Sequence, residues 1–265
     1  MKAWILIILM LGFALTSRAD SGRPPTLQGV GIDQRLNEQV PLDLMFRDET
    51  GQSVRLGDYF GSKPVILALV YYKCPMLCTL TLNGLERTMR VMPLDVGNQY
   101  TVVTVSFDPR ETPALAAAKK QEYLAHYERP GGAAGWHFLT GEESSIRQLT
   151  EVVGFHYNYD PQSGQYAHTT GLVILTPQGK IARYFYGVEF SPRDLRLSLV
   201  EASANKIGSP VDEILLFCFH YDPATGKYGL VIMRVIQIAG AVTVLALGSF
   251  MTLMLLRERE HRLRT

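Results

Sequence analysis

Two cysteines separated by three residues, Cys74 and Cys78, are the strongest chemical signal in the chain. In a helix, residues four apart lie on one face with Cβ atoms about 5 to 6 Å apart, so both sulfurs can reach one metal ion. Pro75 suits the first helical turn, where its missing N–H costs no hydrogen bond, and the helix dipole there favours thiolate. The spacing indicates either a soft-metal site or a disulfide.

His168 is the best candidate for a third ligand among the six histidines. It lies in a polar segment, residues 165–170, that is predicted to be a loop directly before a buried strand. Loops at strand ends are where α/β sheets gather ligands. Two thiolates and one imidazole suit Cu(I), whereas a structural zinc site usually has four protein ligands. The donor set therefore indicates copper.

Cys218 and His220 form a weaker signal. Because they are two residues apart, they would share one face of a short strand. The pair is interpreted as a second copper-handling site, as an interaction loop, or as a buried cysteine beside a solvated histidine. The last interpretation is favoured, because two ligands alone make a poor metal site.

Two further groups of residues have open interpretations. His156 lies between two aromatic residues and is expected to be packed or hydrogen-bonded rather than a ligand. Asp108, Arg110 and Glu111 follow a buried strand. They either tune the charge of the thiolates or contact a partner, or they only begin the next helix with acidic residues near its N-terminus.

The residues that must position these side chains alternate between strand and helix patterns over residues 40–208. This alternation predicts one α/β domain with a central sheet flanked by helices, preceded by a hairpin. The hairpin is expected over 42–56. Strands are expected at 65–71, 101–107, 136–139, 171–175 and 181–186. Helices are expected at 79–92, 112–127 and 191–208, with a further short helix that ends at residue 154.

Both ends of the chain carry apolar runs. Residues 1–19 have the pattern of a secretory signal peptide, and residues 20–39 are expected to lead into the domain. After a juxtamembrane segment at 209–234, the uncharged run 235–256 predicts a transmembrane helix. The arginine-rich tail 257–265 belongs on the cytoplasmic side by the positive-inside rule.

The predicted topology is a single pass through the inner membrane, with the domain in the periplasm and the C-terminus in the cytoplasm. In that compartment, unpaired thiols meet oxidants, and three cysteines leave at least one unpaired. The formal net charge of +1 gives no reason to expect a nucleic-acid partner.

Four segments together resemble the Sco/SenC family over residues 40–204. They are Cys74-Pro-Met-Leu-Cys78, the run from Val105 to Pro113, the run from Trp136 to Gly141, and His168 ahead of residues 171–180. The resemblance implies a thioredoxin-like fold whose cysteine pair and histidine bind copper for the Cu-A centre of cytochrome c oxidase. It also implies subunit II of the oxidase as the recipient.

Three features depart from the family pattern. Thr79 stands where the family often has proline, and Ala167 stands where it often has aspartate. The predicted membrane anchor is C-terminal, whereas the anchor of the family is often N-terminal.

The sequence therefore predicts a metallochaperone, not a turnover enzyme, in which reduced Cys74 and Cys78 bind one copper ion together with His168. Oxidation of the two thiols to a disulfide would release the metal. One alternative is a thiol:disulfide oxidoreductase that keeps the oxidase cysteines reduced and does not need His168. A second alternative is a binding module with a purely structural disulfide.

Overall fold

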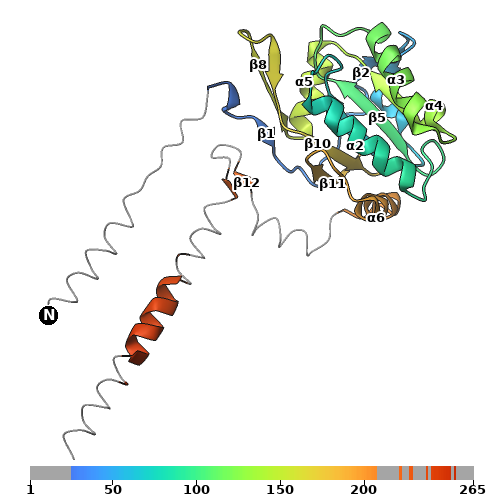
Figure 1. The fold of residues 1–265 in the computed structure, drawn as a ribbon. Helices are drawn as coiled ribbons and strands as arrows, with labels where there is room; N and C mark the ends of the chain where they lie inside the picture. Colours follow the sequence, from blue (N-terminus) through green and yellow to red (C-terminus); the bar gives the residue numbers. More distant parts are fainter. Residues whose placement is uncertain are drawn as a thin grey trace, which may run out of the picture.

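The computed structural model describes residues 25–207, 221–222, 227–228, 237, 240–251 and 254. At its centre is a five-stranded sheet in the order β11-β10-β4-β5-β6 (Figure 1). Strands β4 (Val65–Val70), β5 (Thr101–Ser106) and β6 (Trp136–Leu139) are parallel. Strand β10 (Gly171–Leu175) runs antiparallel to β4, and β11 (Ile181–Tyr186) runs antiparallel to β10. The strands predicted from the sequence are thus confirmed.

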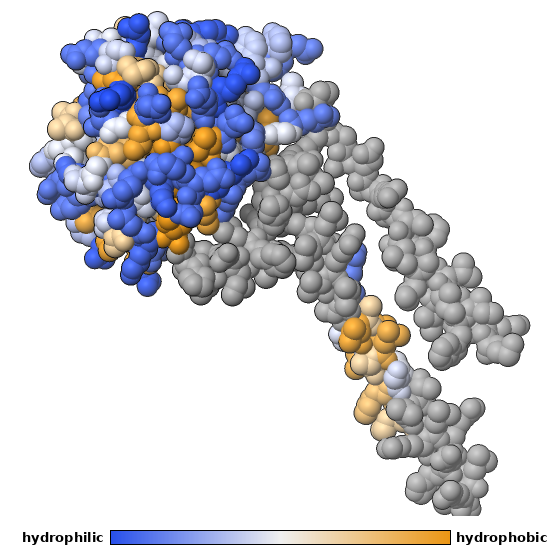
Figure 2. Space-filling view, turned by 180° about the vertical axis from the view of Figure 1, so that it is seen from behind, coloured by the Kyte–Doolittle hydropathy of each residue, from blue (hydrophilic) through white to orange (hydrophobic). Residues whose placement is uncertain are grey.

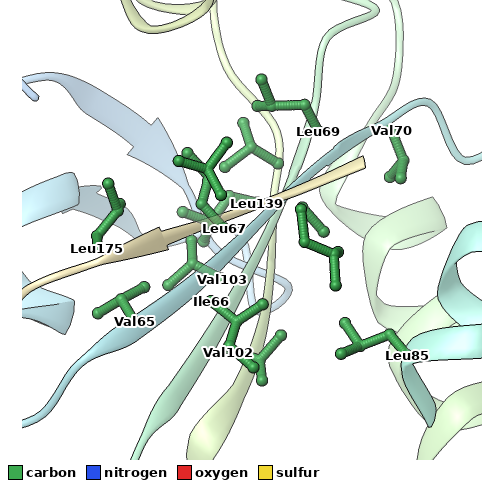
Figure 3. Close-up of a cluster of buried hydrophobic side chains, with 14 of the residues drawn as sticks. Val65, Ile66, Leu67, Leu69, Val70, Leu85, Val102, Val103, Leu139 and Leu175 are labelled. Atoms are coloured by element: carbon green, nitrogen blue, oxygen red, sulfur yellow. The ribbon is translucent and has the colours of Figure 1, made fainter. Parts of the chain in front are cut away.

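The central strands form because their side chains are apolar on both faces. Every residue of β4 and of β5 is buried, as expected for parallel strands covered on each side. Branched side chains of β4 and β5 meet Leu139, Leu175 and Leu85 in the core (Figure 3). The registers pair Val65 with Thr101 and with Leu175, so β4 is tied to the sheet along both edges.

Helix α2 (Leu77–Val91) contacts both α3 (Pro113–Tyr127) and α6 (Pro192–Ser203), and these three helices form one layer on the sheet (Figure 1). Helix α5 (Glu143–Val152) packs against β7 (Phe155–His156), and α4 (Gly132–Gly135) precedes β6. The expected mixed α/β fold with a helix-flanked sheet is therefore confirmed.

Shorter elements complete the described chain. The predicted N-terminal hairpin is formed by β2 (Met45–Arg47) and β3 (Ser53–Arg55), followed by the 3-10 turn η2 (Leu56–Tyr59). The turn η1 (Pro25–Leu27) and strand β1 (Gly31–Ile32) lie in the segment expected to lead into the domain, and β1 pairs with β7. Strands β12 (Tyr221–Asp222) and β13 (Lys227–Tyr228) pair with each other.

The last helix of the domain is shorter than predicted. It ends at Ser203 rather than near residue 208, because Asn205 adopts a left-handed conformation with φ of 57°. The N–H groups of Asn205 and Lys206 then bond to the carbonyls of Ala202 and Glu201, which is the Schellman pattern that terminates helices.

The segment predicted to be a loop around His168 is partly a strand. Residues Gln165–Ala167 form β9, which pairs with β8 (Asn158–Asp160) in a hairpin. At its turn, the Asp160 carboxylate accepts hydrogen bonds from the Gln162 N–H and the Ser163 hydroxyl, and Gly164 has a φ of 69°. This local turn chemistry stabilises the hairpin, which the short polar strands did not indicate.

Within the described residues, no helix is both long and apolar enough to cross a membrane. The described part of the C-terminal run, residues 240–251, is helical and exposes apolar side chains such as Val244, Leu245 and Phe250. Figure 2 shows it as an apolar surface, whereas hydrophilic residues predominate on the visible face of the domain. The predicted signal peptide and much of the predicted span 235–256 lie outside the described residues.

Candidate metal centre

The two cysteines lie where strand β4 gives way to helix α2. The Cys74 N–H closes a turn on the Tyr71 carbonyl at 3.1 Å, and Met76 is the N-cap of the helix. Cys78 lies in the first turn, and its N–H points at the Cys74 sulfur at 3.3 Å. Both cysteines are free thiols, 8% and 3% exposed. The turn therefore buries both sulfurs at the start of one helix.

His168 follows directly after strand β9 and completes the predicted site. Its Nε2 atom lies 3.5 Å from the Cys78 sulfur and 3.9 Å from the Cys74 sulfur. The three donor atoms lie within 4.8 Å of one another. Residues separated by 90 positions in the sequence are thus brought to one point.

The orientation of His168 leaves a ligand lone pair facing the thiols. Its Nδ1 atom lies 2.7 Å from the Thr169 carbonyl, which can only accept, so Nδ1 carries the proton. The unprotonated Nε2 atom then faces the two sulfurs. In metal-binding histidines, a hydrogen bond from the other ring nitrogen commonly fixes this orientation. The ring packs against Tyr71 and Phe107, with centroids 5.7 and 5.4 Å away.

The two thiols have opposite electrostatic character. A hydrogen bond from Cys78 lowers the pKa of Cys74 far below that of a free thiol, although burial opposes the shift. Burial raises the pKa of Cys78, and the neighbouring Cys74 sulfur raises it further. In the reduced protein, Cys74 is therefore the thiolate and Cys78 the thiol.

A buried carboxylate holds the turn that carries the cysteines. Glu111 accepts hydrogen bonds from the N–H groups of Tyr72 and Lys73 at 2.7 and 2.8 Å, and from the Ser106 hydroxyl at 2.6 Å. These contacts tie the residues just before Cys74 to the end of strand β5. Glu111 therefore supports the turn that carries the cysteines, a role that neither interpretation from the sequence described.

Asp108 and Arg110, the other two residues of that group, face the hairpin that carries His168. Arg110 donates to both carboxylate oxygens of Asp108 at 2.8 Å, and Tyr166 of β9 donates to the same carboxylate at 3.3 Å. Sequence reasoning treated these residues as equally consistent with a helix start. Their contact with the hairpin depends on tertiary structure and left no local signal.

The remaining candidates do not join the three donors. His156 is paired with Asp33, with Nε2 3.0 Å from Oδ2, as expected for a hydrogen-bonded histidine. Cys218 and His220 lie outside the described residues. Tyr71 is buried and also contacts the His168 ring, so it lines the site.

The geometry permits two kinds of chemistry. Two sulfurs and one imidazole nitrogen at these separations form a soft donor set of low coordination number, which fits Cu(I). The same two sulfurs, one ionised and one protonated, also form a dithiol that can be oxidised to a disulfide. The first chemistry uses His168 as a ligand, and the second does not.

Comparisons with known proteins agree with this fold. Residues 33–202, more than half of the chain, match the SCO1/SenC family. A SCO1 protein homolog of Bacillus subtilis strain 168 is 25% identical over 186 residues, covering 66% of this chain and 88% of the relative.

Two solved structures share the fold. A putative electron transfer protein from Aquifex aeolicus VF5 has a TM-score of 0.57 at 23% identity, covering 64% of this chain and 95% of that protein. A SCO1/SenC family lipoprotein from Bacillus anthracis strain Ames has a TM-score of 0.52 at 18% identity, covering 65% and 99%. With a family match over most of its α/β domain, this chain belongs to the SCO1/SenC family.

Proposed function

We propose that this protein is a copper metallochaperone that delivers copper to the Cu-A centre of cytochrome c oxidase, with subunit II as the recipient. The observation that carries the proposal is the convergence of two buried sulfurs and an unprotonated imidazole nitrogen within 4.8 Å. Membership of the SCO1/SenC family supports the link to oxidase assembly.

The residues account for binding and release of the ion. The Cys74 thiolate provides one charged ligand, and Cys78 loses its proton when it becomes the second, so binding releases a proton and weakens as the pH falls. His168 supplies the third donor. A recipient with more thiolates, or better-placed ones, can then take Cu(I) by ligand exchange without any change in oxidation state.

The same proposal places the domain in the periplasm, anchored in the inner membrane by residues 235–256 with the C-terminus in the cytoplasm. The support is the uncharged apolar run followed by arginines, and the exposed apolar side chains of residues 240–251. Tagging the C-terminus with a reporter that is active only in the cytoplasm tests this orientation. An inactive C-terminal reporter would contradict it.

A Cu(I) competition titration tests the metal site. The full-length chain, purified in mild detergent and reduced without oxygen, is titrated against a chelator of known Cu(I) affinity. We expect one ion per chain, with affinity lowered at least about tenfold in Cys74→Ser, Cys78→Ser and His168→Ala, because each removes a ligand. His156→Ala is the matched control and should bind as the unmodified chain does. Weak binding by the unmodified chain would overturn the proposal.

The opposite character of the two thiols favours a second candidate, a thiol:disulfide oxidoreductase. In this reaction the Cys74 thiolate attacks a disulfide of the target and releases one target thiolate. Cys78 then loses its proton and displaces the second, so the target is reduced and the Cys74–Cys78 disulfide forms. This activity requires both cysteines and tolerates His168→Ala, whereas copper delivery requires all three residues.

A further inference from the structure

The hairpin formed by β8 and β9 lies outside the central sheet, although it ends at His168. Its two strands hydrogen-bond to each other, and neither belongs to the five-stranded sheet. Figure 1 shows the hairpin extending from the domain beside α5. A cavity of about 780 Å³ opens between it and α5, lined by Arg110, Arg147, Tyr157 and Tyr159 among others. The hairpin on one side of His168 is therefore not hydrogen-bonded into the sheet, whereas β10 on its other side begins at Gly171.

Side chains fasten this hairpin to the loop after strand β5. Arg110 donates hydrogen bonds to both carboxylate oxygens of Asp108. Its Nη1 atom also donates to the Tyr159 hydroxyl of β8 at 3.1 Å. Its guanidinium also lies over the Tyr159 and Tyr166 rings, 4.7 and 5.5 Å from their centroids. We call these four residues, Asp108, Arg110, Tyr159 and Tyr166, the clasp.

Within the clasp, Asp108 is buried and Arg110 is exposed to solvent. The Asp108 side chain is 6% exposed, whereas that of Arg110 is 54% exposed. Burial alone would raise the pKa of Asp108, but hydrogen bonds from Arg110 outweigh it and hold the pKa below its usual value. Asp108 is thus a fixed anion next to β5, and Arg110 joins it to a hairpin residue that is itself partly exposed, Tyr159.

A second attachment holds the other side of the hairpin. The Asn158 amide donates to the carbonyls of Thr26 and Gln28, at 3.2 and 2.6 Å. This contact joins β8 to the N-terminal segment near η1. It anchors β8 at Asn158, the residue that pairs with Ala167, and Ala167 directly precedes His168. The clasp holds the next pair of the hairpin, Tyr159 and Tyr166, and links it to Asp108 after β5.

We propose that Arg110 is a positioning residue that keeps the hairpin closed on the domain and thereby keeps His168 at the two thiols. The inference rests on the proposed function, because it concerns the ligand that separates copper binding from dithiol chemistry. Opening the clasp removes the imidazole from the donor set and leaves the cysteine turn, which Glu111 holds independently, in place. The same site then changes from a three-donor metal site to a dithiol.

A double-mutant cycle on the full-length chain in detergent tests this role. Cu(I) affinity is measured by chelator competition for the unmodified chain, Arg110→Ala, His168→Ala and the double variant. We expect Arg110→Ala to lower the affinity about tenfold, as supporting residues of metal ligands do. In the His168→Ala background, Arg110→Ala should cause no further loss, because its effect passes through that ligand.

The matched control is Arg147→Ala, which removes an arginine from the same cavity whose partner is Glu143 of its own helix. It should leave the affinity unchanged. Tyr159→Ala, which removes the partly exposed outer contact, is a second variant and should lower the affinity only while His168 is present. Hydrogen exchange should become faster in β9 and stay unchanged in β4 when Arg110 is replaced.

Each outcome decides between the inference and its alternatives. Unchanged affinity in Arg110→Ala, or the same loss in both backgrounds, would overturn the positioning role while the proposed function stands. Weak copper binding by the unmodified chain, or full affinity in His168→Ala, would instead overturn the proposed metal site and the inference with it.

Discussion

The two halves of the metal centre are built in different ways. The cysteine half continues directly from β4, a fully buried strand that is paired along both edges, and Glu111 holds its turn through two backbone N–H groups. The histidine half stands on a hairpin outside that sheet and is fastened by side chains, of which Arg110 is more than half exposed. The cysteine half is thus held by backbone contacts of a central strand, and the histidine half by side-chain contacts that include an exposed arginine.

Because of this difference, substitutions that lower the stability of the fold are distinct from substitutions that change the set of donor atoms. A change in the cysteine half disturbs buried hydrogen bonds and affects the whole domain. A change in the histidine half alters the ligand set and leaves the core intact. For the proposed metallochaperone, one fixed pair of ligands and one ligand beside a separable element would suit both binding and release of copper.

The largest expected effect is on the cysteine half. Glu111→Ala removes the acceptor of two backbone N–H groups and of the Ser106 hydroxyl, and should lower the free energy of unfolding by about 3 kcal/mol. Urea unfolding followed by the fluorescence of buried Trp136 measures the loss. Glu151→Ala, at an exposed position on α5, is the control. An equally small loss in both variants would show that Glu111 does not hold the turn.

Hydrogen exchange compares the two halves directly. Amides of β4 should exchange at least about a hundredfold more slowly than those of β8 and β9, because the hairpin can open locally while β4 exchanges only when the domain unfolds. Exchange followed by mass spectrometry on peptides from the two regions measures this ratio. Equal protection would mean that the hairpin is part of the same cooperative unit, which contradicts the comparison.

The reactivity of Cys74 tests whether its charge depends on the hairpin. Because its pKa lies far below that of a free thiol, Cys74 stays a thiolate as the pH falls from 8 to 6. Alkylation by iodoacetamide should therefore change less than about twofold over this range, whereas an ordinary thiol slows several tens of times.

The hydrogen bond from Cys78 is the largest cause of this shift, so the flat profile should persist in His168→Ala. Peptide mapping by mass spectrometry identifies the alkylated cysteine. A profile that regains the usual pH dependence in His168→Ala would show that the histidine half sets the charge of the cysteine half.

The smallest expected effect is that of Tyr72→Phe. The Tyr72 hydroxyl donates to the carbonyls of Thr104 and Leu139, at 3.1 and 2.8 Å, beneath the cysteine turn. Its loss should cost about 1 kcal/mol of unfolding free energy and leave Cu(I) affinity unchanged, because no ligand moves. Urea unfolding and chelator competition on the same preparation check both statements. A fall in affinity would show that the cysteine half is less rigid than its contacts indicate.

Much of this arrangement was predictable from local sequence patterns. The five central strands and the helices follow apolar runs and their period, and the cysteine spacing predicted the two sulfurs at a strand-to-helix junction. His168 was identified as the third donor from its residue type and position, and its Nε2 atom lies 3.5 Å from the Cys78 sulfur. The strands, the helices and the identity of each donor depend on residues close together in the chain, whereas the approach of His168 to the sulfurs does not.

Other features were not predictable, because they have weak local patterns or depend on residues far apart in the chain. The β8–β9 hairpin consists of short polar strands without alternation, and its turn is stabilised by Asp160 and Gly164. The roles of Glu111 and Arg110 depend on partners 38 and 49 residues away, Lys73 and Tyr159. A carboxylate after a strand has the same local pattern whether it caps a helix or holds a distant turn.

The sequence by itself determined the chemistry of the donors, the strand-to-helix junction that presents the cysteines, and the α/β domain around them, because residue type and local periodicity encode these. Only the tertiary structure decided how the donors meet and what holds them. The distance from His168 to the sulfurs, the tautomer set by Thr169, and the contrast between a buried carboxylate under Cys74 and an exposed arginine beside the hairpin all arise from contacts between distant segments. Such contacts form when apolar strands collapse into one sheet and bring their polar ends to the same edge.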